Sequence, residues 1–228
     1  MSNRPIPYSS DYYALLAKNR ELSGDEATFF AHCQAGKIYA LLFTQATPST
    51  ILDIGCGDGL LTSFIQALYP QAQVYGCDTN SESIEFARLA YPTITFDSMD
   101  TTLPYQDATF DVVIASHVLH HIAHDRHAWY VQEMNRVLKP GGTLIVLELN
   151  PYNPITAWQF KKNPLEKGLT MVSARYTAGL LRPLGVASTI FYGFFMNHLQ
   201  WLQGQEHYLA WLFVGPLYAC VVRKSINH

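Results

Sequence analysis

The stretch Ile51-Leu52-Asp53-Ile54-Gly55-Cys56-Gly57-Asp58-Gly59 decides how this chain folds. A short apolar run carries an acid near its end, three glycines follow at alternate positions, and a helical pattern begins at once with Leu60. Glycines at a turn from strand to helix let the backbone bend sharply and approach a ligand closely. Open α/β sheets bind ligands beyond the carboxyl ends of their strands. We therefore predict a ligand-binding loop at the end of this strand.

Outward from this loop, short apolar runs alternate with amphipathic segments. The predicted strands are residues 50–54, 73–77, 93–96, 110–115 and 142–149, followed by 186–195 and 213–222. The predicted helices are residues 11–45, 60–68, 81–90, 124–138 and 173–181, and residues 199–212 are compatible with another. This alternation predicts an α/β fold with a doubly wound, mostly parallel, seven-stranded sheet.

The overall composition narrows the class of protein. With 228 residues, 49% hydrophobic and 14% charged, the chain is far from the composition of disordered proteins. A net charge of -3 disfavours a nucleic-acid partner. The four cysteines are scattered and no signal-peptide or transmembrane pattern is visible, so we expect a cytoplasmic protein.

A second acid, Asp78, closes the predicted strand 73–77 and follows Gly59 by 19 positions. At this place in such folds a carboxylate accepts the two ribose hydroxyls of a nucleoside. The third glycine of a dinucleotide fingerprint is replaced here by Leu60, and no Tyr-x-x-x-Lys pair occurs. Asp53 would also repel a pyrophosphate and would suit a ligand ammonium. A nicotinamide-dependent oxidoreductase is therefore disfavoured.

Three further motifs follow in order. They are Ser98-Met99-Asp100-Thr101-Thr102-Leu103-Pro104-Tyr105, Phe110-Asp111-Val112-Val113-Ile114-Ala115-Ser116 and Arg136-Val137-Leu138-Lys139-Pro140-Gly141-Gly142-Thr143-Leu144. With the glycine loop they make residues 48–149 resemble the class I S-adenosylmethionine-dependent methyltransferases, nearest to the small-molecule and quinone-biosynthesis subgroup. The resemblance implies a Rossmann-like fold, S-adenosyl-L-methionine as cofactor and S-adenosyl-L-homocysteine as product.

The resemblance also implies a set of cofactor-binding residues. These are Asp53, Gly55, Cys56, Gly57, Gly59, Asp78, Thr79, Asp100, Thr101 and Ser116. Asp97 competes with Asp100 for the adenine amino group, and we prefer Asp100 because it lies closer to Leu103-Pro104. Asp111, at a strand start, is expected to serve the structure.

Five histidines, at positions 117, 120, 121, 124 and 127, fall within eleven residues. Metal binding is disfavoured because no cysteine or acid nearby completes a tetrahedral set, so we expect no metal site. His117, His120 and His121 are candidates for a general base or a substrate contact, since histidine titrates near neutral pH. Packing or solvation is the alternative for each of them.

The ends of the chain suggest where an acceptor would bind. We divide a single methyltransferase domain, 1–228, into an N-terminal helical lid (1–47), a cofactor-binding core (48–150) and a substrate-side part (151–228). Tyr8, Tyr12 and Tyr13 are candidates to close over the cofactor. Asn150 and Asn153 follow the strand 142–149 and could equally bind substrate or form turns.

Between Arg182 and Arg223 the sole formal charge is Glu206, among many aromatic residues. We infer a hydrophobic pocket, an interface for a dimer, or a membrane-facing surface. The expected function is methyl transfer to a small, apolar or lipid-like acceptor, with peripheral membrane contact and a membrane-proximal location. A non-catalytic cofactor-binding or partner module remains the alternative, and nucleic-acid methylation is disfavoured by the charge.

Overall fold

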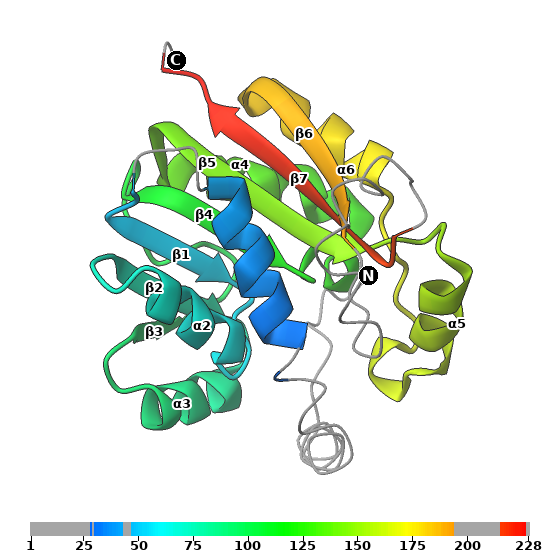
Figure 1. Cartoon of the computed structure of the whole chain (residues 1–228), viewed down its shortest axis with the longest axis horizontal. Helices are drawn as coiled ribbons and strands as arrows, with labels where there is room; N and C mark the ends of the chain where they lie inside the picture. Colours follow the sequence, from blue (N-terminus) through cyan, green and yellow to red (C-terminus); the bar gives the residue numbers. More distant parts are fainter. Residues whose placement is uncertain (1–27, 29, 43–46, 194–214, 227–228) are drawn as a thin grey trace.

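The computed structural model describes residues 28, 30–42, 47–193 and 215–226 (Figure 1). A helix over residues 30–42 comes first. The elements that follow are β1 (Thr50–Ile54), α2 (Leu60–Leu68), β2 (Gln73–Asp78), α3 (Ser81–Ala90), β3 (Thr95–Ser98), β4 (Phe110–Ser116), the 3₁₀ helices η1 (Leu119–His121) and η2 (His124–Arg126), α4 (His127–Val137), β5 (Leu138–Leu149), α5 (Pro154–Lys162), η3 (Pro164–Glu166), α6 (Ala174–Leu181), η4 (Arg182–Leu184), β6 (Gly185–Gly193) and β7 (Leu217–Lys224).

The strands form one seven-stranded sheet in the order β3-β2-β1-β4-β5-β7-β6. The first five strands in this order pair in parallel, whereas β7 pairs antiparallel with both β5 and β6. The predicted doubly wound, mostly parallel fold is therefore confirmed. Chain connections run in opposite directions on the two sides of the β1–β4 pair, and open α/β sheets bind their ligands at such a switch point.

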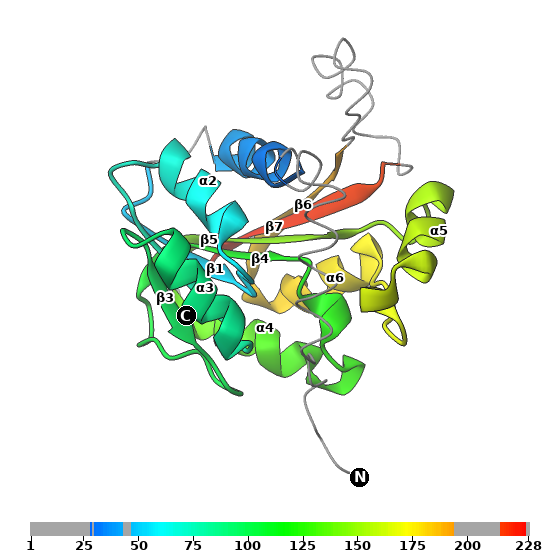
Figure 2. The same ribbon diagram turned by 90° about the horizontal axis from the view of Figure 1, so that it is seen from below.

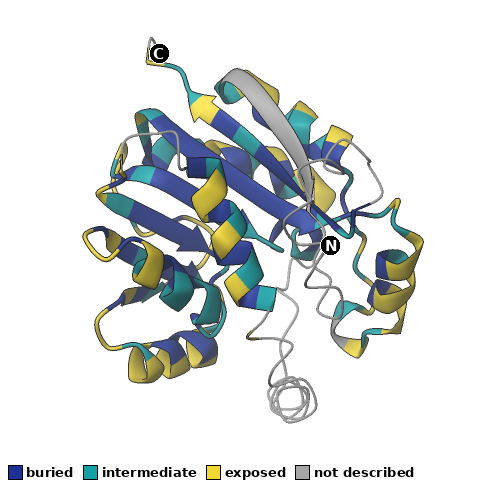
Figure 3. Cartoon of the chain, viewed as in Figure 1, coloured by how far each residue is buried: buried dark blue, intermediate teal, exposed yellow. Residues whose placement is uncertain are grey.

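Helices cover both faces of the sheet, as the edge-on view shows (Figure 2). On one face, Val112 and Ile114 of β4 pack with the helix 30–42 and α2. On the other face, Val113 and Ala115 pack among residues of α4 and α6. Because both faces are buried, β4 reads as a continuous apolar run rather than an alternating one, and the central strands are dark in the burial view (Figure 3).

The structure corrects several predicted boundaries. The helix predicted over 124–138 is η2 followed by α4, which begins at His127. The strand predicted from residue 142 begins at Leu138, which pairs with Phe110 before the register shifts. A Cβ at Gly142 would lie within 2.9 Å of the backbone oxygens of Asp111 and Lys139, so this crowded bulge requires glycine.

A helix, α5, occupies the stretch after β5, where we predicted no helix. The Asn153 side chain accepts a hydrogen bond from the backbone N–H of Thr156, and Pro154 stands in the first turn. Both features start helices, because the cap satisfies an exposed N–H and proline has none to satisfy. Pro154 therefore marks the start of a helix here.

Several expectations fall wholly or partly outside the described residues. The predicted N-terminal helix is confirmed over 30–42, and the candidate lid tyrosines Tyr8, Tyr12 and Tyr13 lie outside. The strand predicted over 186–195 is β6, and the strand predicted over 213–222 is β7. The segment between them, with most of the C-terminal aromatic residues, lies outside. Among the described helices, none combines the length and apolar character that crossing a bilayer requires.

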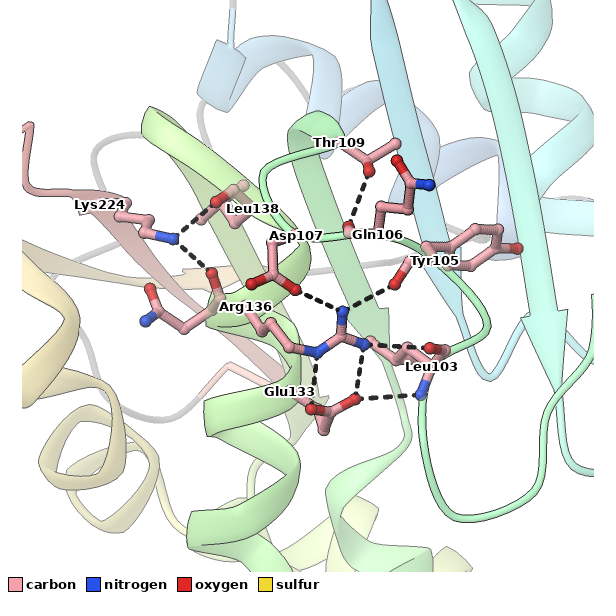
Figure 4. A network of polar contacts seen from close by, with 10 residues as sticks. Leu103, Tyr105, Gln106, Asp107, Thr109, Glu133, Arg136, Leu138 and Lys224 are labelled. Atoms are coloured by element: carbon pink, nitrogen blue, oxygen red, sulfur yellow. Dashed lines mark hydrogen bonds and ion pairs between the residues drawn. The ribbon is translucent and has the colours of Figure 1, made fainter.

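One arginine ties the loop between β3 and β4 to α4 (Figure 4). Arg136 donates hydrogen bonds to the backbone carbonyls of Leu103 and Tyr105. Its guanidinium also binds the carboxylates of Glu133 and Asp107. A planar guanidinium with several fixed donors suits this role better than the single ammonium of lysine. Arg136 therefore binds the loop that follows Asp100 through two backbone carbonyls and through the side chain of Asp107.

Candidate functional site

The glycine loop after β1 is shaped by backbone contacts. Gly55, Gly57 and Gly59 have positive φ angles of 69°, 54° and 82°. The backbone N–H groups of Gly55 and Cys56 both donate to the carbonyl of Cys77 at the end of β2, at 2.7 and 3.1 Å. L-residues with a Cβ adopt such φ values only at a cost. The three glycines are therefore required by the conformation itself.

Two of these glycines face different surroundings. A Cβ at Gly55 would lie 2.5 Å from Cγ2 of Val118, in the loop after β4, so the two loops are in close contact. A Cβ at Gly57 would meet no atom of the described residues within 4 Å. The backbone at Gly57 is thus open to a ligand, whereas Gly55 is needed for packing.

Asp78 ends β2 and lies next to the glycine loop at the same edge of the sheet. Its Oδ2 accepts a hydrogen bond from Gly57 N–H at 2.9 Å, and its Oδ1 accepts one from Asn80 N–H at 2.8 Å. Burial raises the pKa of Asp78, although these N–H donors oppose the shift. Each carboxylate oxygen has two lone pairs, so both can still accept a hydroxyl. The carboxylate is fixed in place and keeps the capacity to bind a ribose.

Asp53, which we expect to suit a ligand ammonium, is buried near the end of β1. It is 1% exposed, and its Oδ2 accepts a hydrogen bond from the hydroxyl of Thr62 at 2.7 Å. Burial raises its pKa to about 7, against the effect of Thr62 and together with the nearby charge of Asp78. The contact of Asp53 with a ligand ammonium stays a prediction, because the contact of its carboxylate that the described residues show is the hydrogen bond from Thr62.

The two competing acids for the adenine position differ in their partners. The carboxylate of Asp97 accepts a hydrogen bond from the Tyr105 hydroxyl at 3.0 Å and lies 4.0 Å from Arg88. Asp100 is exposed, and the N–H of its neighbour Met99 donates to the carbonyl of Asp78, which holds it beside the second acid. Which of the two acids contacts the adenine amino group stays a prediction, and we keep Asp100.

The remaining predicted cofactor residues lie around the same edge. Thr79 and Thr101 are exposed, and Cys56 is buried under the glycine loop. Ser116 ends β4, and its hydroxyl oxygen is buried without a hydrogen-bond partner among the described residues. An unpaired buried hydroxyl costs about 1–3 kcal/mol, so a ligand atom that pairs with it would be favoured.

The three candidate histidines lie close together in the chain: His117 precedes η1, whereas His120 and His121 belong to it. His117 has a positive φ of 59°, and its Nε2 lies 2.6 Å from the amide nitrogen of Gln34. Burial lowers the pKa of His117 to about 4. Burial and the neighbouring His120 also lower the pKa of His121 to about 4. His117 and His121 are therefore neutral at pH 7.

His120 is buried between two glutamates that lie far from it in the sequence. Its Nδ1 lies 2.6 Å from Oε2 of Glu148, and its Nε2 lies 3.5 Å from Oε2 of Glu166. Burial lowers the pKa of His120, but the hydrogen bond to Glu148 and the charges of both glutamates outweigh burial and raise it. Burial raises the pKa of Glu166. Burial also acts to raise the pKa of Glu148, but the hydrogen bond to His120, the charges of the neighbouring histidines and the Leu119 N–H together lower it. Sequence reasoning missed both glutamates, because only the topology brings them to His120.

Other residues of interest serve the structure. His127 Nε2 lies 2.9 Å from the carbonyls of Leu119 and Ile122, which holds the histidine loop. Asn150 is fully buried and its amide donates to the carbonyl of Gly215. These contacts favour turn and packing roles.

Asp111 accepts hydrogen bonds from Ser49, Thr50 and Lys139, which together lower its pKa despite partial burial. Asp111 lies at the amino end of β4, and its partners lie at the amino ends of β1 and β5, at the opposite end of the strands from the glycine loop. The expected structural role of Asp111 is confirmed.

Comparison with known proteins agrees with this geometry. Residues 52–146 match the family model described as a methyltransferase domain. The trans-aconitate 2-methyltransferase of Methylobacterium nodulans is 34% identical over 101 residues, which are 44% of this chain and 38% of that protein. Phthiotriol/phenolphthiotriol dimycocerosates methyltransferase 1 of Mycobacterium ulcerans is 32% identical over 115 residues, 48% of this chain and 41% of that protein. The chain thus spans about two fifths of the length of these curated relatives.

A SAM-dependent methyltransferase from Archaeoglobus fulgidus has the same fold, with a TM-score of 0.65 and 18% identity over 85% of this chain and 94% of that one. The family match, the ordered motifs and the fold make this chain similar to the class I S-adenosylmethionine-dependent methyltransferases. S-adenosylmethionine is the cofactor that this family implies. The open backbone at Gly57, the fixed carboxylate of Asp78 and the unpaired hydroxyl of Ser116 fit a polar nucleoside ligand.

Proposed function

We propose that this chain transfers a methyl group from S-adenosylmethionine to a small, apolar or lipid-like acceptor. The observation that carries the proposal is the hydrogen bond from Gly57, in the loop after β1, to Asp78 at the end of β2, next to the β1–β4 switch point. There a ligand can approach the backbone closely beside a fixed carboxylate. The matched methyltransferase domain and its relatives support the same reaction.

In this proposal each side chain positions a different part of the cofactor. Asp78 accepts the ribose hydroxyls, Asp100 accepts the adenine amino group, and the glycine loop lies along the remainder. When bound, S-adenosylmethionine supplies an electrophilic methyl group that needs no further activation. Catalysis then depends mainly on orientation, which is worth about 7–11 kcal/mol when the reacting atoms are well aligned.

The inference of an apolar acceptor rests partly on exposed side chains on and just before α5. Tyr152, Ile155 and Trp158 come at three-residue spacing and are 65%, 67% and 57% exposed. Lys161 and Lys162 follow on the same helix, and Lys162 Nζ lies 4.0 Å from the centre of the Trp158 ring. The helix follows β5, so it lies beyond the carboxyl ends of the parallel strands and shows exposed positions (Figure 3).

Exposed tryptophan, tyrosine and isoleucine beside lysines suit the surface of an anionic membrane. We therefore propose that this chain works next to a membrane, with α5 touching the bilayer, and that its acceptor is lipid-like. One of the relatives acts, by its name, on phthiotriol dimycocerosates, and another acts on trans-aconitate. The first relative supports a lipid-like acceptor and the second a small one.

Membrane contact can be tested by co-sedimentation with vesicles that contain phosphatidylglycerol. We expect the wild type to sediment with them and Trp158→Ala with Ile155→Ala to reduce the bound fraction severalfold. Leu89→Ala is the matched control, because Leu89 is 85% exposed on α3 and outside the α5 surface. Equal binding by all three proteins would show that α5 is not the contact, and no binding by the wild type would remove the membrane proposal.

The reaction itself is tested first by binding. Calorimetric titration should show that S-adenosylhomocysteine binds to the wild type and that NADH does not. Incubation of S-adenosylmethionine with apolar alcohols, phenols and quinols should then release S-adenosylhomocysteine. Binding without turnover on any acceptor would favour the non-catalytic module, and binding of NADH alone would contradict the proposal.

A further inference from the structure

Three possible metal donors converge beside the cofactor edge. His120 and His121 belong to η1, and Glu166 ends η3. One donor atom from each of them lies within 4.8 Å of the other two. Nε2 of His120 and Oε2 of Glu166 are 3.5 Å apart. Two ligands of a tetrahedral ion with bonds of about 2.0–2.2 Å are separated by about 3.4 Å, so this pair already has the spacing of a metal centre.

The same pair of atoms is left unsatisfied by the described part of the chain. Both Nε2 of His120 and Oε2 of Glu166 are buried and find no hydrogen-bond partner there. Their separation of 3.5 Å exceeds that of an ordinary N–H···O bond, about 2.9 Å. Buried polar atoms without partners cost about 1–3 kcal/mol each. A bound cation would satisfy both atoms at once.

A second carboxylate orients the ring of His120. Oε2 of Glu148 lies 2.6 Å from Nδ1 of His120, and Oε1 of the same glutamate accepts a hydrogen bond from Leu119 N–H at 2.7 Å. When Nδ1 carries the proton for Glu148, the lone pair of the neutral ring is on Nε2, which faces Glu166. Histidines that bind metals are typically held by a carboxylate in this way.

An overlapping set, His117 with His120 and Glu148, also brings three donors together. In that set Nε2 of His117 already contacts Gln34 at 2.6 Å, and Glu148 is engaged by Nδ1 of His120. The set that includes Glu166 is the better candidate, because two of its donor atoms have no other use among the described residues.

We propose that His120, His121 and Glu166 bind a divalent transition-metal ion, Zn²⁺ in the first instance, and that Glu148 positions His120. Two histidines and one glutamate form a donor set that leaves a coordination position open on zinc. Val118, two residues before His120, packs against Gly55, so the ion would lie next to the cofactor loop. An oxygen atom of the acceptor could occupy the open position and be oriented there. Only this last role rests on the proposed methyl transfer.

The site is tested by metal binding on the full chain, independently of turnover. After chelation and dialysis, Zn²⁺ is titrated by calorimetry, and Co²⁺ is added in parallel to record the visible spectrum of the coordinated ion. We expect about one ion per chain. His121→Ala and Glu166→Gln should abolish this binding, and Glu148→Gln should weaken it by about 10–100-fold.

His124→Ala is the matched control, because His124 is an exposed histidine of the same segment outside the donor set. It should bind zinc like the wild type, and so should Cys33→Ser, which removes a partly exposed thiol. Circular dichroism and S-adenosylhomocysteine binding in the presence of chelator report whether each variant is folded.

Zinc binding that is absent from the wild type, or equal in His121→Ala, Glu166→Gln and His124→Ala, would overturn the metal site. His120 would then be interpreted as a cation held between Glu148 and Glu166. A wild type that binds zinc but not S-adenosylhomocysteine would contradict the proposed function instead. The two failures are therefore distinguishable.

Discussion

The candidate site has two sides, a cofactor side and a histidine side, which are built in opposite ways. The cofactor side consists of a continuous stretch, residues 53–59, with Asp78 and Asn80 from the next strand end, and it relies on backbone N–H groups. The histidine side combines η1 with Glu148 of β5 and Glu166 of η3, and it relies on side chains. A site made of backbone leaves a motif in the sequence, whereas a site made of distant side chains does not.

The largest expected effect is on cofactor affinity, in a variant that changes the cofactor side and leaves the histidine side intact. Asp78→Ala removes the proposed acceptor of the ribose hydroxyls, and two hydrogen bonds to a charged group are worth about 3 kcal/mol or more. We expect calorimetry to show S-adenosylhomocysteine affinity reduced by about 100-fold, with zinc binding unchanged. Glu82→Ala, at an exposed acid in the first turn of α3, is the control and should bind normally. Undiminished affinity in Asp78→Ala would mean that the cofactor does not use this carboxylate.

A pair of glycine variants tests where the two sides touch. Gly55→Ala and Gly57→Ala share the strain of a positive φ, but only the first would press against Val118. Overpacking of this kind costs about 1–3 kcal/mol. We expect urea denaturation to show Gly55→Ala less stable than Gly57→Ala by about 2 kcal/mol.

The same pair should differ in ligand binding. Gly57→Ala places a methyl group where the backbone is open to a ligand. It should therefore bind S-adenosylhomocysteine more weakly than the wild type and bind zinc almost normally. Gly55→Ala displaces Val118 and should weaken both ligands. Equal stability and equal affinities in the two variants would show that the loops are not coupled through Val118.

The buried acid of the cofactor side should make stability depend on pH. Burial raises the pKa of Asp53 to about 7 from an ordinary value of 3.8, with Asp78 adding to the shift. The folded protein then binds a proton more tightly than the unfolded chain. The contribution of Asp53 to stability is full below about pH 4, and it is lost as pH rises through about 7.

Asp53→Asn keeps the side chain neutral and removes this dependence. Between pH 5 and pH 7.5, we expect the wild type to lose on the order of 2 kcal/mol more unfolding free energy than the variant. Asp78, Cys56 and Cys77 also interact with Asp53 and are present in both proteins, so the difference isolates Asp53. Parallel pH profiles in the two proteins would mean that Asp53 is ionised throughout.

The smallest effect concerns the loop that follows Asp100. Arg136→Lys keeps the charge but cannot reach the two backbone carbonyls and two carboxylates that Arg136 binds. Because the side chain of Arg136 is 29% exposed, we expect a loss of only about 1 kcal/mol in the free energy of unfolding. S-adenosylhomocysteine affinity should fall less than tenfold and zinc affinity not at all. A change in zinc binding would show that the loop also supports the histidine side.

The sequence by itself determined the sheet, the glycine loop and the place of Asp78, because each depends on neighbours within a few residues. Periodicity distinguishes strands from helices, and a turn with three positive φ angles requires glycine wherever it occurs. The start of α5 was misjudged for a related reason, since the same proline and asparagine signals serve both turns and helix caps.

Only the tertiary structure decided which acids meet the histidines. Glu148 and Glu166 lie 28 and 46 positions after His120, and neither separation follows a helical or strand period. Parallel pairing of β4 with β5 brings Glu148 to η1, and the chain that returns after α5 brings Glu166. Burial makes unpaired charges costly, so His120 and the two carboxylates must either pair with one another or bind an ion.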